Sequence, residues 1–340
     1  MTQPVGIVAD IGGTHARFAT VTCLTGGSAV VHESRVLRTE DFPAFEAAYK
    51  AYVSDVAFAP RRAVFALATP IGCGELKLTN NSWRLDPSML ATTLGLEDVR
   101  CVNDFEAIAW GLPGVSPENL RSLDGSYFKL PERGVISIVG PGSGLGVALL
   151  SRKRDDVGMS RVRDGDRVHT SEGGHAGFAP ADEVDADILR FLSARYPHVS
   201  AERLISGPGL VEIYLALAAM EGRDVAPPQT VALWDAAITG DDPFAAAALE
   251  RWLMLLGGFA GDVALAHGAA AVVFAGGLLP RLGARLDHKL VVERFCAKGR
   301  LETALRKIPL AMIKQPEPGL FGAATLLLNG HMPGTPVTLA

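Results

Sequence analysis

Two glycine-rich segments carry the residue types that hold phosphate groups. The segment "DIGGTHAR" (10–17) places an acid, two glycines and a threonine between two apolar, strand-like stretches. Glycine lets the backbone turn its N–H groups toward a phosphate, and Thr14 adds a hydroxyl donor. Because the carboxylate of Asp10 would repel a phosphate, a divalent cation between the two is the natural interpretation. A tight hairpin whose turn needs the positive φ of glycine explains the same residues equally well.

The segment "GPGSGLG" (140–146) has the same two interpretations, with Ser143 in the hydroxyl role. It is not a Walker A loop, because no Gly-Lys-Ser/Thr follows, and its glycine spacing is not that of a dinucleotide-binding fold. Each loop alone is weak evidence. Two such loops, each after a strand that opens its half of the chain, could face one another across a cleft and hold a polyphosphate from both sides. The pair therefore favours nucleotide binding.

Other polar residues could bind a sugar or an adenosine. Glu172 and His175 share the loop "SEGGHAGFAP" (171–180), where no HExxH or second histidine supports a metal, but where both side chains could bond sugar hydroxyls. Glu202 is a further candidate, although a solvated glutamate at a helix start is the more common explanation. In "FAGGLLPR" (274–281), the glycines before a helix start could accept an adenosine, or could serve only as a close packing turn.

The pair Asn103 and Asp104 ends an apolar strand, and a helical pattern follows at once. An aspartate at the N-cap would accept a hydrogen bond from the first turn, which explains its position without any chemistry. The alternative is a general base at the carboxyl end of a strand, where ligands bind in open α/β sheets. The local sequence does not separate the two.

The pattern of apolar residues predicts a mostly parallel α/β protein. A strand, a glycine turn and a second strand occur twice, at 5–20 and 135–150, which indicates two related domains. A Pro-, Gly- and Ser-rich stretch at 113–134 is expected to be a linker or crossing. The expected helices are 42–56, 182–195, 207–221, 244–268 and 319–328; the expected strands include 62–71, 98–103, 271–281 (running into a helix start) and 308–313.

Composition narrows the class of protein. Of 340 residues, 48% are hydrophobic and 20% charged, as in a globular protein, and the net charge of −5 argues against a nucleic-acid partner. The four cysteines have no ligand-like spacing, which fits reduced thiols in the cytoplasm. The uncharged stretches 263–280 and 318–340 do not look like membrane spans, and no basic region precedes the first strand. We expect a cytoplasmic protein that does not bind a membrane.

Taken in order, the motifs resemble those of the bacterial glucokinase family, in the hexokinase/actin/heat-shock ATPase superfamily, along essentially the whole chain. The matching segments are "DIGGTHARFA", "LTNNSW", "VNDFEA", "GPGSGLGVA", "EGGHAGFAP", "HVSAERLISGPGL", "FAGGLLPR" and "PGLFGA". The "EGGH" element is also similar to the ExGH of the repressor, open-reading-frame and kinase group. That group's zinc-binding cysteine cluster is absent here, which favours the glucokinase family.

The resemblance implies a two-domain actin-like ATPase (ribonuclease H-like) α/β fold with the active-site cleft between the domains. The small domain would comprise 1–110 plus 315–340, and the large domain 111–314. The implied reaction is ATP-dependent phosphorylation of the 6-hydroxyl of D-glucose, the first step of glycolysis, with Mg²⁺ as cofactor. A homodimer is common in the family and is expected here.

The resemblance also assigns roles to residues of this chain. Asp104 matches the catalytic base and also lies among the residues that hold the sugar hydroxyls, which are Asn103, Asp104, Glu172, His175 and Glu202. The ATP- and phosphate-binding residues would be Asp10, Ile11, Gly12, Gly13, Thr14, Gly140, Gly142, Ser143, Gly144, Gly276 and Gly277. Asp10 would hold Mg²⁺ through water. Two departures from the family pattern are His15, where many members carry Asn, and Ser143, where Thr is common.

Other functions remain open from the sequence. A kinase for mannose, fructose or N-acetylglucosamine would have the same motifs. A sugar-responsive regulator is expected to carry a helix-turn-helix extension, whereas the first strand here begins close to Met1. An actin-like assembly ATPase is the remaining alternative.

Overall fold

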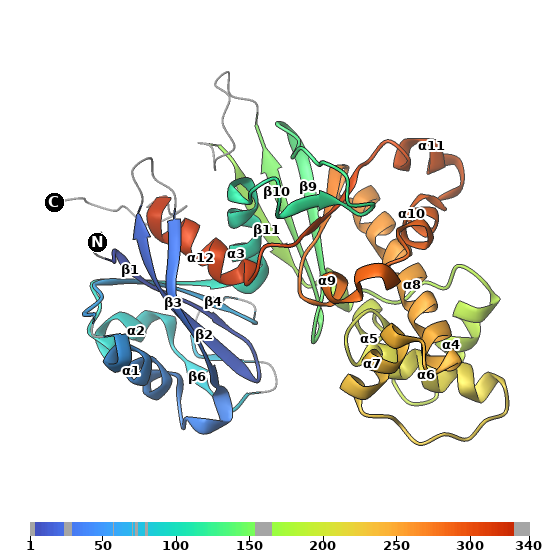
Figure 1. Cartoon of the computed structure of the whole chain (residues 1–340), viewed down its shortest axis with the longest axis horizontal. Helices are drawn as coiled ribbons and strands as arrows, with labels where there is room; N and C mark the ends of the chain where they lie inside the picture. Colours follow the sequence, from blue (N-terminus) through green and yellow to red (C-terminus); the bar gives the residue numbers. More distant parts are fainter. Residues whose placement is uncertain are drawn as a thin grey trace. The chain divides into compact units, whose positions relative to one another are not determined.

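The computed structural model describes residues 4–23, 29–56, 58–69, 71, 74–78, 81–153 and 165–329. These residues group by their contacts into two units (Figure 1). Unit 1 contains the described residues of 1–115 and 316–340, and unit 2 contains those of 116–157 and 163–315. Thr79 and Asn80 of the "LTNNSW" motif lie outside the described residues.

Unit 1 is built on a five-stranded sheet in the order β3-β2-β1-β4-β7, in which β1, β4 and β7 are parallel. The strands are β1 (Gly6–Ile11), β2 (His15–Cys23), β3 (Ala29–Arg38), β4 (Arg62–Leu67) and β7 (Asp98–Asn103), with a separate pair β5 (Leu76–Lys77) and β6 (Arg84–Leu85). The helices are α1 (Phe45–Val56), α2 (Pro87–Leu94), α3 (Asp104–Gly111) and α12 (Pro318–Asn329).

The alternation of side chains along β1 assigns a helix layer to each face of this sheet. Ile7, Ala9 and Ile11 belong to one core cluster with the aromatic residues of α1. Successive side chains of a strand point to opposite faces, so Gly6 and Asp10 face the other way, toward α12. A Cβ on Gly6 would lie 2.9 Å from Leu327 of α12. The β1 strand thus turns its one carboxylate toward α12.

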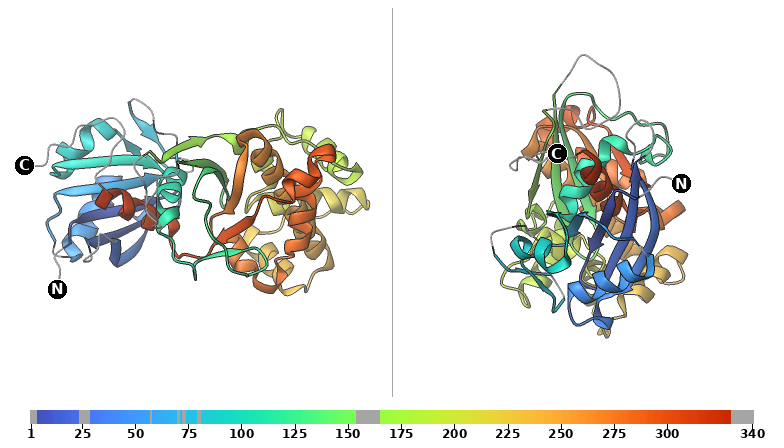
Figure 2. Two further views of the ribbon diagram at one scale, coloured as in Figure 1. Left: turned by 90° about the horizontal axis from the view of Figure 1, so that it is seen from above. Right: turned by 90° about the vertical axis from the view of Figure 1, so that its left-hand side faces the viewer.

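Helices α3 and α12 cross at two glycines. A Cβ built on Gly322 would overlap the carbonyl oxygen of Ala107, and one on Gly111 would lie 2.8 Å from the Cα of Gly322. Since neither glycine has a side chain, the two backbones can touch. In both views of Figure 2, the red α12 lies against the blue-to-teal elements of unit 1. This contact explains the second glycine of "PGLFGA".

Unit 2 is built on a six-stranded mixed sheet in the order β11-β10-β9-β12-β13-β8. The strands are β8 (Leu120–Ser122), β9 (Gly134–Pro141), β10 (Leu145–Arg152), β11 (Arg167–Ser171), β12 (Ala269–Phe274) and β13 (Leu310–Ile313). The helices are α4 (Glu183–Ser193), α5 (Ala201–Leu204), α6 (Gly209–Met220), α7 (Thr230–Thr239), α8 (Pro243–His267), α9 (Leu278–Leu282), α10 (His288–Cys296) and α11 (Glu302–Leu305).

The 25-residue helix α8 forms the centre of the unit 2 core. Its indole Trp252 is fully buried and lies edge-on to Trp234 of α7, with ring centroids 5.2 Å apart. Among the described residues, α8 is the helix long and apolar enough to cross a membrane by length and composition, yet 56% of that stretch is buried inside the protein. A core helix has the same properties, and α8 is one.

Most predicted elements are confirmed. The five predicted helices correspond to α1, α4, α6, α8 and α12, and both strand–glycine–strand modules are present as β1–β2 and β9–β10. Three expectations were wrong in detail. The sheets are mixed rather than mostly parallel, because six of the ten strand pairings among the described residues are antiparallel. The strand predicted over 62–71 ends at Leu67, and the expected linker 113–134 contains β8, which pairs with β13. Helices α2, α7 and α10 were not predicted.

Two neighbouring glycines of α8 test the close packing of α8 on α10. A Cβ on Gly257 would overlap the carbonyl oxygen of Val291, whereas a Cβ on Gly258 would meet no described residue within 4 Å. We expect Gly257→Ala to lower the free energy of unfolding by about 1–3 kcal/mol through overpacking. Gly258→Ala should raise it by about 0.5–1 kcal/mol, because alanine loses less backbone entropy in a helix. Denaturant unfolding measures both, and equal shifts would contradict the packing described.

Candidate active site

The turn between β1 and β2 is open on one side and held on the other. Thr39 holds it, because its amide donates to the Thr14 carbonyl (3.1 Å) and its hydroxyl donates to the Gly13 carbonyl (2.9 Å). Gly12 does not have a positive φ, and within the described part of the chain a Cβ there would meet only the His15 carbonyl oxygen, at 3.8 Å. The hairpin explanation, which needs a positive φ, therefore does not account for Gly12. Open space beside the backbone is what an approaching phosphate requires.

A pocket of about 650 Å³ lies beside this turn in unit 1. The Thr14 hydroxyl is exposed and lies 3.0 Å from Nδ1 of His15, which also lines the pocket. The full lining consists of Gly13, Thr14, His15, Arg38, Thr39, Glu40, Phe42, Asn81 and Ser82. The His15 side chain, the departure from the family pattern, thus contacts the hydroxyl expected to bind phosphate.

Asp10 faces the start of α12. A Cβ on Gly319 would lie 2.9 Å from its carboxylate, so this glycine leaves room for the acid. Burial raises the pKa of Asp10 to about 6; the charge of Arg17 lowers it and that of Glu317 raises it further. No group of three or more His, Cys, Asp and Glu side chains within the described ranges could hold a metal alone. A single carboxylate is nevertheless typical of a Mg²⁺ site. Mg²⁺ keeps several waters and binds through one or two carboxylates and the substrate phosphates.

Asn103, and not Asp104, caps helix α3. The Asn103 side-chain oxygen accepts from the amides of Phe105 (3.0 Å) and Glu106 (3.3 Å), while its Nδ2 donates to the Thr69 carbonyl (3.3 Å). Asp104 is therefore not the N-cap residue, although its carboxylate also accepts from the Phe105 amide (3.0 Å). Asp104 is the first residue of the helix, where the positive end of the helix dipole favours an ionised carboxylate.

The parallel strands bring the polar residues of unit 1 to one edge. The strand register pairs Ile11 of β1 with Leu67 of β4, and Leu67 with Asn103 of β7. Asp10 and Asp104 adjoin this row, so the two carboxylates lie at the carboxyl ends of β1 and β7. Arg100 holds the first turn of α3 in place through an ion pair with Glu106 (2.9 Å).

The turn between β9 and β10 (140–146) repeats these features in unit 2. Ser143 is exposed, and a Cβ on Gly142 would meet no atom of the described residues within 4 Å, although its φ is not positive. Gly276, after β12, has a φ of +91°, and a Cβ there would lie 2.9 Å from the Pro141 carbonyl oxygen. The "FAGG" segment therefore packs on the β9–β10 turn. Gly276 meets a packing need, whereas a Cβ on Gly277 would be in open space.

Three of the predicted sugar-binding residues meet in unit 2. Nε2 of His175 lies 3.8 Å from Oε2 of Glu172 and 3.7 Å from Oε1 of Glu202. The side chains of Glu172 and His175 are 61% and 58% exposed, and that of Glu202 is 30% exposed, so all three can reach a ligand. A Cβ on Gly174 would overlap the Leu145 carbonyl oxygen, which shows how closely the EGGH loop (171–180) lies on β10.

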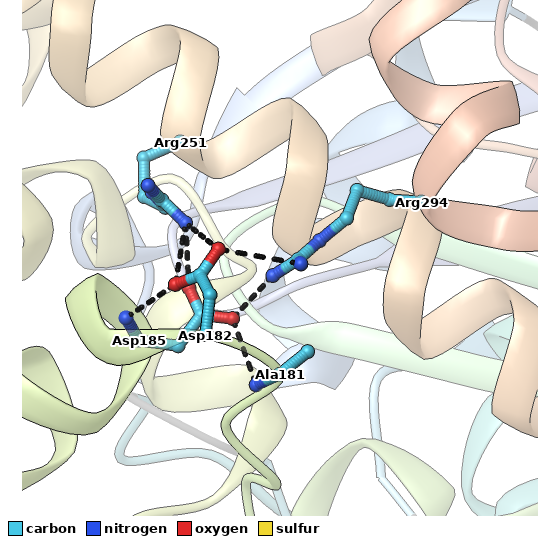
Figure 3. Close-up of polar contacts among 5 residues, drawn as sticks. All are labelled: Ala181, Asp182, Asp185, Arg251 and Arg294. Carbon is cyan, nitrogen blue, oxygen red and sulfur yellow. Dashed lines mark hydrogen bonds and ion pairs between the residues drawn. The ribbon is translucent and has the colours of Figure 1, made fainter. Parts of the chain in front are cut away.

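The far end of the EGGH loop is fixed by four charged residues (Figure 3). Asp182 caps α4, and Arg251 of α8 donates to it at 2.7 Å and to Asp185 at 3.0 Å. Arg294 of α10 pairs with both carboxylates. Burial alone would raise the pKa of Asp182, but hydrogen bonds from the Asp185 amide and Arg251 lower it. Two carboxylates and two guanidinium groups balance, so α4, α8 and α10 are joined without a net buried charge.

Sequence reasoning missed several residues that position the site. The sequence predicted no role for Thr39 or Gly319, although Gly319 lies in the "PGLFGA" motif. Two glycines three apart at a helix start, in "PGLFGA", are a signal of close backbone contact. The Asp182, Asp185, Arg251 and Arg294 cluster had no signal, because its members come from three helices.

The capping role of Asn103 can be tested by stability alone. Asn103→Ala removes the acceptor for two amides and should lower the free energy of unfolding by about 0.5–2 kcal/mol. Asp104→Asn leaves the Asn103 cap in place and keeps an oxygen for the Phe105 amide. It should lower the free energy of unfolding by at most about 1 kcal/mol, through the lost dipole interaction. Thermal or denaturant unfolding of both variants measures this. A larger loss of stability for Asp104→Asn than for Asn103→Ala would contradict the capping role of Asn103.

Comparison with known proteins agrees with these features. A family model described as Glucokinase matches residues 7–330. A glucokinase of Zymomonas mobilis subsp. mobilis is 40% identical over 326 residues, covering 96% of this chain and 98% of that protein. A solved glucokinase from an Antarctic psychrotroph is 33% identical, with a TM-score of 0.80 over 97% of this chain and 100% of that one. A Balamuthia mandrillaris glucokinase in complex with glucose is 18% identical and shares the fold, with a TM-score of 0.75 over 96% and 93%. The chain belongs to the glucokinase family.

Proposed function

We propose that this protein is a glucokinase, which transfers the γ-phosphoryl group of ATP to the 6-hydroxyl of D-glucose. The observation that carries the proposal is the pair of open glycine turns. Among the described residues, neither a positive φ nor a packing contact requires glycine at position 12 or 142. Each turn presents an exposed hydroxyl, of Thr14 or Ser143. Space beside the backbone together with donors is what a polyphosphate needs.

The domain organisation is part of the proposal. The small domain (1–110 with 315–340) and the large domain (111–314) form an actin-like fold with ATP and sugar in the cleft between them. The repeated strand–glycine–strand module, which opens the sheet of each unit, supports this arrangement.

Asp104 acts as the general base. Its carboxylate takes the proton of the sugar 6-hydroxyl as that oxygen attacks the γ-phosphorus, and the bond from phosphorus to the β–γ bridging oxygen breaks to release ADP. Among the described residues, Nδ2 of Asn103 bonds only to the Thr69 carbonyl, and its second hydrogen donates to the sugar. Asp10 would hold Mg²⁺ through water; bound with ATP, the ion neutralises charge on the phosphate oxygens.

Glu172, His175 and Glu202 select the sugar by bonding its other hydroxyls. A site that hydrogen-bonds a substrate hydroxyl rejects analogues without that hydroxyl, because the polar groups of the site would be left unpaired. We place the reaction in the cytoplasm, at the first step of glycolysis, in a homodimer without nucleic-acid or membrane partners. A kinase for mannose, fructose or N-acetylglucosamine is the alternative that uses the same residues.

Replacing the proposed base tests its role directly. Asp104→Asn keeps the size of the side chain and leaves the Asn103 cap intact, but it removes the proton acceptor. We expect kcat to fall by about 10²–10⁴-fold, with a much smaller change in the KM for glucose. A coupled assay for ADP measures both constants, and the unfolding transition checks the fold. If kcat stays within a few-fold of the wild type, Asp104 is not the base.

Substrate choice and water exclusion are tested with one assay. We expect glucose to be turned over faster than mannose, fructose and N-acetylglucosamine at equal concentration. Without sugar, ATP hydrolysis should be very slow, because sugar binding closes the cleft and completes the site. Faster turnover of another hexose would change the assigned substrate, and rapid hydrolysis without sugar would contradict closure.

A further inference from the structure

Glu202 contacts both the β9–β10 turn and the EGGH loop. Its Oε2 accepts a hydrogen bond from the Leu145 amide at 2.8 Å, at the end of the turn expected to hold phosphate. Its Oε1 lies 3.7 Å from Nε2 of His175, among the residues expected to hold the sugar. One carboxylate therefore has one oxygen on each of two binding segments.

The backbone that carries Glu202 is held at both ends. This connecting segment (198–207) donates from Ala201 to the Ala176 carbonyl of the EGGH loop, at 2.9 Å. At its other end, the Gly207 amide donates to the Gly142 carbonyl at 2.7 Å, and Trp234 donates to the Gly207 carbonyl at 2.8 Å. With its backbone fixed in this way, the segment leaves the Glu202 side chain as the part that can respond to a ligand.

Gly144 leaves the space in which the Glu202 carboxylate lies against the turn. A Cβ at position 144 would lie 2.5 Å from Oε2 of Glu202, so only glycine allows the carboxylate to lie on the turn. A Cβ on Gly142, two residues earlier, would have no neighbour within 4 Å among the residues that the structure describes. The two glycines of one turn therefore differ in purpose, since Gly142 leaves space for a ligand and Gly144 leaves space for Glu202.

We infer that Glu202 couples sugar binding to nucleotide binding by holding the β9–β10 turn through its second oxygen. The inference rests on the proposed function and adds a regulatory role to one of its sugar-binding residues. A sugar hydroxyl that donates to Oε1 fixes the carboxylate with Oε2 on the Leu145 amide. The turn is then ordered before the nucleotide arrives, which lowers the cost of binding it. By linkage, the nucleotide strengthens sugar binding by the same factor, typically about 5–150-fold.

The first test changes a residue of the β9–β10 turn and measures the affinity for glucose. Gly144→Ala displaces Glu202 although position 144 has no proposed sugar contact, and Gly142→Ala adds the same methyl group to open space. Calorimetric titration with glucose, in the absence of nucleotide, should show at least a five-fold loss of affinity for Gly144→Ala. Gly142→Ala should bind glucose as the wild type does. Equal affinities of the two variants, both folded by their melting temperatures, would overturn the inference.

The second test changes Glu202 and measures the affinity for magnesium ADP. Glu202→Gln keeps an oxygen for the Leu145 amide, whereas Glu202→Ala removes it. Without sugar, the affinity for magnesium ADP should be near the wild-type value in Glu202→Gln and several-fold lower in Glu202→Ala. Identical losses in the two variants would overturn the role of the Leu145 contact.

The effect of magnesium ADP on glucose affinity distinguishes a failure of this inference from a failure of the proposed function. In the wild type, magnesium ADP should raise glucose affinity, and in Gly144→Ala this factor should approach one. If the wild type phosphorylates glucose but the two ligands bind independently, the inference fails and the proposed function stands. If the wild type binds neither glucose nor nucleotide, both fail.

Discussion

The contact between the backbones of α3 and α12 fixes the geometry of unit 1. It exists because Gly111 and Gly322 have no side chains. Helix α3 begins with Asp104, and α12 begins beside Asp10, so the crossing sets where both carboxylates meet the sheet edge. A methyl group at the crossing would separate the helices and shift both acids. The positions of the Asp10 and Asp104 carboxylates thus depend on Gly111 and Gly322 having no side chains.

The sequence predicted the regular elements with strong periodicity and missed those without it. The long helices and the two strand–glycine–strand modules have clear apolar patterns. Helix α10 contains Val291 and Val292, whose branching favours strands, and its packing on α8 overrides that preference. Strand β8 has three residues, which is too short for any pattern to emerge; it exists because it pairs with β13.

Candidate site residues could be predicted from motifs, but their contacts could not. The roles of Asn103 and Asp104 were ambiguous, because either residue type can cap a helix and only the backbone geometry separates them. The bond from the Leu145 amide to Glu202 joins residues from different motifs. No local rule gives the distance between them, since it depends on how the connecting segment is folded back onto β10.

The place of α12 in the chain affects the order in which unit 1 can fold during synthesis. Helix α12 covers one face of β1 and contacts α3, yet residues 112–317 must be translated before it emerges. At the usual pace of about 5–20 residues per second, this takes roughly 10–40 s. During that interval, the face of β1 that carries Asp10 is uncovered on the ribosome. The N-terminal unit is thus completed last, after the unit that follows it in the sequence.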